Sequence, residues 1–177
     1  MKRLRKLISN RKYPRLVALF LTALSCVFVT ANADEPAFTM TTIIDSAHGA
    51  EIVAGKYEQA IERIAAIDSD QSTFFNSTNL CVAYTKIGNV ADAVLACDAA
   101  IEQANSMSFD RQRYLSRHAK ERMRSKYLAL ALSNRGVLRA ATGDVELARQ
   151  DFVEALGVSA RSSVVKTNLA RLEKGKA

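Results

Sequence analysis

Proline is almost absent from this chain of 177 residues, and glycine is sparse. The two prolines are Pro14 and Pro36, so none interrupts the sequence beyond residue 36. No stretch shows the strict alternation of apolar and polar residues that is typical of strands. Alanine, leucine, glutamate, arginine and glutamine are frequent instead, and these residues favour helices. The sequence therefore predicts an all-α fold.

Residues that form common catalytic or metal-binding motifs are also scarce. The two histidines, His48 and His118, are far apart, and neither belongs to an HExxH or a Cys/His metal spacing. No G-x-S-x-G elbow, phosphate-binding glycine loop or G-x-G-x-x-G is present. We expect a protein that is not an enzyme and that has no cofactor and no metal site. Four carboxylates are expected at helix ends and caps, where a structural role suffices: Asp68, Asp70, Asp144 and Asp151.

Acidic residues are missing from the first 33 positions, which contain seven of the 25 lysines and arginines. The remainder has 18 basic and 18 acidic residues, so the net charge of +7 comes from this N-terminal stretch. An apolar run over 16–30 and the small residues Ala31 and Ala33 follow it, as in a secretory signal peptide. The run is shorter than the ~20 residues of a membrane-spanning helix. We predict a signal peptide over 1–33, with an uncleaved anchor as the alternative.

Export would place the protein in the periplasm or outside the cell, and the long basic stretch is typical of a bacterial envelope protein. Cys26 would leave with the signal peptide, which leaves Cys81 and Cys97. In an oxidising compartment an even pair indicates a disulfide before a metal site or a nucleophile. The alternative is that both cysteines are reduced and serve as small core residues.

Internal repeats are the most informative feature of the sequence. Asn134 and Asn168 are 34 residues apart, and Gly55 and Gly88 are 33 apart. One series has small or apolar residues at fixed distances from a glycine: Gly136, Ala148, Phe152 and Ala155 around Gly143, and Cys81, Ala93, Cys97 and Ala100 around Gly88. A second series consists of triplets centred on asparagine: Thr78-Asn79-Leu80, Ser133-Asn134-Arg135 and Thr167-Asn168-Leu169.

This period and these residues resemble the tetratricopeptide repeat family. The chain departs from the family pattern at Arg139, where an aromatic is usual, and at Cys81, where glycine or alanine is usual. The resemblance implies antiparallel helical hairpins stacked as a short right-handed solenoid. The expected parts are a flexible leader over 34–42 and a domain over 43–177, with hairpins over about 44–68, 73–104 and 128–157, a helical insertion over about 105–127 and a capping helix over 163–174.

In such hairpins the two remaining cysteines would face one another. Cys81 would lie on the inner face of the first helix of the second hairpin, and Cys97 on the inner face of its second helix. Antiparallel packing would bring their Cα atoms into the range of about 4.4–6.8 Å that a disulfide needs. This placement favours the disulfide over two reduced cysteines.

By the same resemblance, the first helices would line a concave groove that holds extended or helical peptides. The groove is mildly apolar and Lys86 is almost its only charge, so a charged C-terminal peptide is not the expected ligand. Asn79 and Asn134 are interpreted as parts of the ordinary repeat pattern. The residues expected to line the groove are Phe75, Thr78, Val82, Thr85, Lys86, Leu130, Ser133, Val137, Ala140 and Ala141.

The insertion carries a basic stripe on a helix expected to run without a break from Asp110 into the third hairpin. Residues 34–110 have a net charge of −9 and residues 111–177 a net charge of +9. The stripe is either a solvated helix face or a docking surface for an acidic partner, an anionic lipid surface or a second copy. Nucleic acid is not expected, because no aromatic residues interleave the arginines. The stripe consists of Arg113, Arg117, Lys120 and Arg124.

The sequence thus predicts a non-catalytic interaction module or assembly adaptor of the bacterial envelope that binds a partner polypeptide in its groove. One alternative is a structural envelope protein that docks to an anionic surface through the insertion. Another is an accessory subunit of a larger secretion or envelope complex.

Overall fold

The computed structural model describes residues 38–46, 48–67, 73–109 and 113–175, and the regular structure in these ranges is helical. The all-α prediction is therefore confirmed. The predicted signal peptide, Cys26, Asp68 and Asp70 lie outside the described residues. Among those described, no helix is long and apolar enough to span a membrane. The helices are α1 (Gly49–Val53), α2 (Tyr57–Ala65), α3 (Phe74–Ile87), α4 (Val90–Ser106), α5 (Arg117–Ala141), α6 (Val145–Val158) and α7 (Ser163–Lys174).

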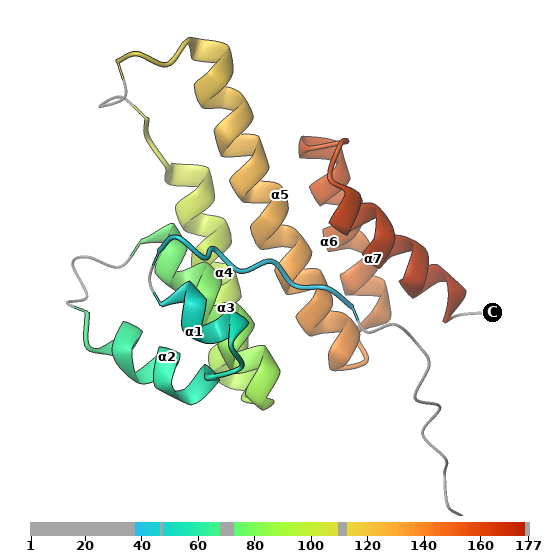
Figure 1. Ribbon diagram of the computed structural model, residues 1–177. Coiled ribbons are helices and arrows are strands. Elements are labelled where there is room, and N and C mark those ends of the chain that lie inside the picture. The colour runs from blue at the N-terminus through green and yellow to red at the C-terminus, as the bar shows by residue number, and fades with distance from the viewer. Residues whose placement is uncertain (1–37, 47, 68–72, 110–112, 176–177) are drawn as a thin grey trace, which may run out of the picture. The chain divides into compact units, whose positions relative to one another are not determined.

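Tight turns pair α3 with α4 and α5 with α6 as antiparallel hairpins (Figure 1). Gly88 ends α3 with φ 76°, and Gly143 precedes α6 with φ 90°, both in the left-handed region that suits glycine. The side chain of Asn89 caps α4 by accepting a hydrogen bond from the backbone N–H of Asp92 at 3.4 Å. Asp144 precedes α6 but makes no such cap. Both glycines are the reference points of the repeated series in the sequence, and each lies in the turn of a hairpin.

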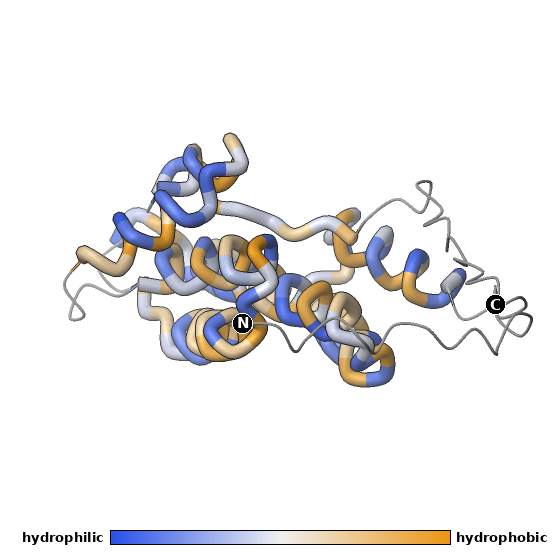
Figure 2. Tube along the Cα trace, turned by 90° about the horizontal axis from the view of Figure 1, so that it is seen from below, coloured by the Kyte–Doolittle hydropathy of each residue, from blue (hydrophilic) through white to orange (hydrophobic). Residues whose placement is uncertain are grey.

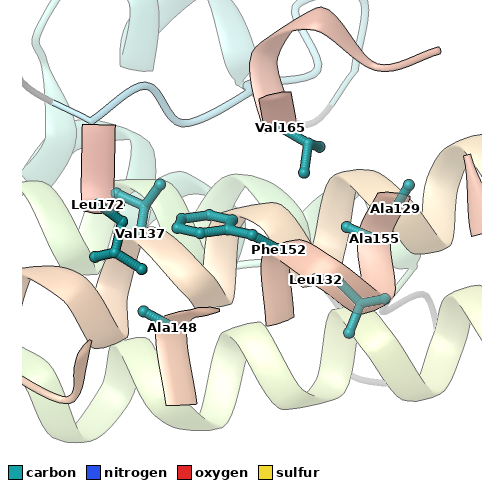
Figure 3. Packing of buried hydrophobic residues seen from close by; sticks show 8 residues of the cluster. All are labelled: Ala129, Leu132, Val137, Ala148, Phe152, Ala155, Val165 and Leu172. Carbon is teal, nitrogen blue, oxygen red and sulfur yellow. The ribbon is translucent and has the colours of Figure 1, made fainter. Parts of the chain in front are cut away.

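The largest apolar cluster joins α5, α6 and α7. Phe152 of α6 is completely buried in it, and Figure 3 shows its ring directed toward Val137 of α5. Gly136 of α5 permits this packing, because a Cβ atom there would lie 2.6 Å from Cε1 of Phe152. Hydrophobic and hydrophilic residues alternate around the helices (Figure 2), which is the pattern of helices that bury one side.

The insertion differs from the uninterrupted helix expected from Asp110. It lengthens two helices, since α4 continues to Ser106 and α5 begins only at Arg117. The side chain of Ser116 starts α5 by accepting from the backbone N–H of Ala119 at 3.2 Å. At ~1.5 Å per residue, the 25 residues of α5 make it about 37 Å long.

The loop between α4 and α5 is anchored to α5. The guanidinium of Arg124 donates to the carbonyl oxygen of Met107 at 3.2 and 2.9 Å. Phe109 is buried, with its ring 6.3 Å from that of Tyr127. These contacts turn the chain back on itself, and they explain why the sequence, which lacks a proline or glycine here, does not continue as one helix.

The two ends of the helical array differ in regularity. At the N-terminal end the helices are short, since α1 has five residues and α2 has nine. At the other end, α7 spans Ser163–Lys174, the bounds expected for the capping helix, and the side chain of Ser162 accepts from the backbone N–H of Val165.

Candidate functional site

A segment without regular secondary structure, Phe38–Ile43, crosses the first helices of the hairpins and reaches α7 (Figure 1). The sequence predicted a flexible leader over 34–42. That prediction is wrong for residues 38–42, because hydrogen bonds and apolar contacts hold them; residues 34–37 lie outside the described residues. The sequence indicated flexibility because the segment has no helical periodicity. The residues that hold it are distant in the chain, so no local pattern reveals these contacts.

Asparagine side chains hold the backbone of this segment. The amide of Asn168 in α7 accepts from the N–H of Thr39 at 3.0 Å and donates to the carbonyl oxygen of the same residue at 2.8 Å. Asn134 in α5 repeats the arrangement on Thr41, at 2.8 and 2.9 Å. Each side chain therefore satisfies both backbone groups of one residue.

A third asparagine completes the series in α3. Asn79 accepts from the N–H of Ile43 at 2.9 Å and donates to its carbonyl oxygen at 3.0 Å. It also donates to the carbonyl oxygen of Ser46 at 3.1 Å, which ties down the turn before α1. We call the surface formed by Asn79, Asn134 and Asn168 the asparagine face.

The chemistry of the asparagine face is specific for an extended polypeptide. It contacts residues 39, 41 and 43, whose backbone groups point the same way in an extended chain, where successive residues alternate in direction. The three asparagines are at most 1% exposed, and the segment supplies the backbone groups that Asn134 and Asn168 bond, while Asn79 bonds Ser46 as well. Because these bonds reach only main-chain atoms, they do not themselves select a side-chain sequence.

Apolar side chains of the segment complete the contact. Phe38 stacks on Phe152, with ring centroids 6.4 Å apart. Met40 packs against three apolar clusters, which contain Val82, Leu138 and Val137 respectively. Ile43 packs against a fourth cluster, around Phe74 and Ala131 of α3 and α5.

The residues predicted to line an open groove are largely covered by the protein's own chain. Thr78, Val82, Ser133 and Val137 are at most 5% exposed. These positions do lie on the first helices, but Met40 and its neighbours pack over the clusters there. Of the other predicted groove residues, Phe75, Thr85, Leu130 and Ala140 are half-buried, and Lys86 and Ala141 are exposed.

Phe75 belongs mainly to an aromatic cluster at the base of the insertion. Its ring centroid lies 5.8 Å from that of Tyr127 and 5.6 Å from that of Phe74. The cluster joins the beginning of α3 to the middle of α5. Phe75 therefore anchors the insertion as much as it borders the asparagine face.

A buried ion-pair network joins the helices next to Asn134. Asp151, expected at a helix end, lies instead inside α6, 1% exposed, with Arg135 and Arg139 each at 2.8 Å. Arg139 makes one of these pairs from α5. Burial by itself lowers the pKa of Arg135, but hydrogen bonds to Asp151 and Asp98 outweigh burial and raise that pKa. The network fixes α5 against α6 and is structural.

The predicted disulfide is present. Cys81 of α3 and Cys97 of α4 are bonded, with their Cα atoms 4.8 Å apart. Both are buried in the cluster that Met40 also contacts. The disulfide therefore fixes α3, which carries Asn79, to α4.

The predicted basic stripe is only partly assembled. Arg117, Lys120 and Arg124 share one side of α5, where they line an open depression together with Glu121. Arg113 lies before α5 begins, so it does not continue the helical stripe. Arg124 is occupied by the carbonyl oxygen of Met107, and Glu121 adds an opposing charge. The stripe is therefore a weaker site for binding anions than the sequence indicated.

The two histidines do not lie together in the structure. His48 is half-buried, with Nδ1 3.2 Å from Oε1 of Glu51, and His118 is exposed on α5. In the described part of the chain, no three His, Cys, Asp or Glu side chains gather in a way that could hold a metal ion.

The sequence contained a signal for the asparagine face, namely the triplets around Asn79, Asn134 and Asn168. From the sequence alone, these triplets indicate only positions that recur in each repeat, because nothing in the sequence shows that the leader returns to these side chains. Comparison with protein-family models, curated proteins and solved structures finds no match to this chain.

Proposed function

We propose that this protein is a non-catalytic interaction module that holds an extended segment of a partner polypeptide along the asparagine face. The observation that carries the proposal is the repeated pairing of one asparagine amide with both backbone groups of one residue. Three helices that are distant in the sequence supply it: α3, α5 and α7. A site with this geometry binds the extended backbone, which all polypeptides share, so it suits an adaptor.

The framework supports the same proposal. We regard the α3–α4 and α5–α6 hairpins as repeats of the tetratricopeptide type, arranged as a short right-handed solenoid that ends at α7. The spacing of the glycines and the Gly136–Phe152 contact support this assignment. We further propose that the protein acts in the bacterial envelope after cleavage near Ala33, where the Cys81–Cys97 bond would be stable.

Docking to an anionic surface through the insertion is the less supported alternative. Arg124 is engaged in the loop anchor, and Arg113 lies off the helix. An accessory role inside a larger envelope complex is compatible with the adaptor proposal.

Site-specific photo-crosslinking in living cells tests the proposal. A photoreactive residue at Lys86 or at Ala141 would sit at the exposed border of the face, on α3 and on α5. Both positions should crosslink to one and the same partner segment, because an extended chain bound to the asparagines passes both helices. Leu95, 70% exposed on α4, is the matched control and should not capture that segment.

Two results would contradict the proposal. One is that Lys86 and Ala141 capture no segment, or only segments that Leu95 captures as well. The other is that crosslinks form only from Arg117 and Lys120, which would favour docking through the insertion.

A further inference from the structure

The asparagine face is already filled by the protein's own chain, and this occupant shows what a partner must look like. We infer that Phe38–Ile43 is a built-in ligand, and that the partner is an extended segment with uncharged apolar side chains at the positions of Phe38, Met40 and Ile43. This inference rests on the proposed function, since it specifies the partner of the same face.

An empty asparagine face would be unfavourable. A partner segment therefore binds by taking the place of the built-in ligand. Without an occupant, Asn134 and Asn168 would exchange their backbone partners for water, while Asn79 would keep its bond to the carbonyl oxygen of Ser46. The apolar side chains beneath Met40, including Val82 and Val137, would also meet water. The partner therefore replaces the built-in ligand in these contacts.

The apolar clusters supply the selectivity that the backbone contacts lack. Phe38 stacks on Phe152, Met40 joins three clusters and Ile43 joins a fourth. Phe38, Met40 and Ile43 are half-buried against these clusters, so a charge at any of the three positions would lose apolar contacts and part of its hydration, which is unfavourable. The required pattern is apolar–x–apolar–x–x–apolar.

The neighbouring positions tolerate other residues. Thr39 is exposed, and its hydroxyl receives a single hydrogen bond, from Arg171 at 3.2 Å. Ile44 is 59% exposed and lies just beyond the last position of the pattern. Substitutions at Ile44 therefore provide a control within the same segment.

Exchange predicts that weakening the built-in ligand tightens binding of a competitor. The apparent dissociation constant equals the intrinsic one divided by the fraction of molecules whose face is free. Truncation of Phe38 and Met40 removes apolar contacts of the built-in ligand and leaves all three asparagines in place. The double variant Phe38→Ala/Met40→Ala of the full chain should thus bind more tightly than the wild-type chain.

The probe is a fluorescent synthetic peptide with the sequence of residues 36–46, PAFTMTTIIDS, and anisotropy measures its binding. We expect the double variant to bind it at least about tenfold more tightly than the wild-type chain or the Ile44→Ala control. A second peptide that carries Met40→Asp should bind none of the three proteins. Circular dichroism before each titration checks that the helices are intact.

Hydrogen exchange on the wild-type chain gives an independent readout if the double variant does not fold. The N–H groups of Thr39, Thr41 and Ile43 donate to asparagines and should exchange slowly. Saturating probe peptide should speed their exchange, because the built-in ligand leaves. The Met40→Asp peptide should leave their exchange unchanged.

The possible failures have different meanings. Equal binding of the two peptides would overturn the apolar pattern and leave the adaptor proposal intact. Absence of binding by either peptide, with exchange at Thr39, Thr41 and Ile43 unchanged, would overturn both. A concentration-dependent dimer of the wild-type chain in light scattering, dissociated by the probe peptide, would show that a second copy's segment is the occupant, and would overturn the inference of a separate partner.

Discussion

The absence of a side chain at Gly136 decides how closely α5, which carries Asn134, can pack against α6. Gly136 directly follows Arg135 and Asn134 in α5, and it faces Phe152 of α6. Phe152 is fully buried among residues of three helices, so its ring has no free space into which to move. An added methyl group at residue 136 must therefore push α5 and α6 apart.

Gly136→Ala should destabilise the protein by about 1–3 kcal/mol, the usual cost of overpacking a core. Gly157→Ala is the matched control, because it lies in α6 with no atom within 4 Å of the added Cβ. That variant should be neutral or gain up to about 1 kcal/mol from helix propensity. Urea unfolding measures both, and equal effects would show that contact with Phe152 is not the cause.

At the scale of an element, the disulfide makes the α3–α4 hairpin the rigid part of the array. It joins buried positions on the two helices, 16 residues apart in the sequence. The hairpin supplies Asn79 and the cluster under Met40, so its geometry controls the end of the face near α1. By contrast, α1 and α2 are short helices, and no disulfide joins them in the described residues.

Reduction of the Cys81–Cys97 bond should lower the free energy of unfolding by about 3 kcal/mol, the chain-entropy value for a loop of this size. Urea unfolding with and without a thiol-free reductant measures the change. The double variant Cys81→Ala/Cys97→Ala should be insensitive to the reductant. A wild-type midpoint that stays the same on reduction would show that the bond does not stabilise the fold.

At the scale of the whole molecule, six residues near the N-terminus connect helices from one end of the array to the other. Hydrogen bonds run from Thr39 to α7, from Thr41 to α5 and from Ile43 to α3. Met40 is the centre of this connection, since it reaches the clusters of both complete hairpins. The segment thus links the two complete hairpins and α7.

Met40→Asp should destabilise the whole described domain by about 1–3 kcal/mol, because it removes apolar contacts and places a charge at a half-buried position against apolar side chains. Ile44→Asp is the control and should change stability by less than about 1 kcal/mol, since Ile44 is exposed. Thermal unfolding measures both variants. Similar midpoints for the two would show that Met40 does not connect the hairpins.

The elements differ in how far their sequences predicted them. Three features follow from local chemistry. The hairpin turns at Gly88 and Gly143 need a left-handed glycine, the cysteine pair joins two small residues on facing helices, and α7 begins at a serine cap. The break before Arg117 was missed because it depends on distant contacts of Phe109 and Arg124. The buried place of Asp151 was missed for the same reason, since Arg135 and Arg139 satisfy it.

The sequence by itself determined that the chain is helical, that its hairpins recur and that Cys81 faces Cys97, because these depend on helical periodicity and on neighbours within one hairpin. Only the tertiary structure decided what lies over the first helices. The bonds from Asn134 to Thr41 and from Asn168 to Thr39 join residues 93 and 129 positions apart. No local pattern specifies such a return of the chain, since an asparagine amide can pair with any extended backbone that the fold brings to it.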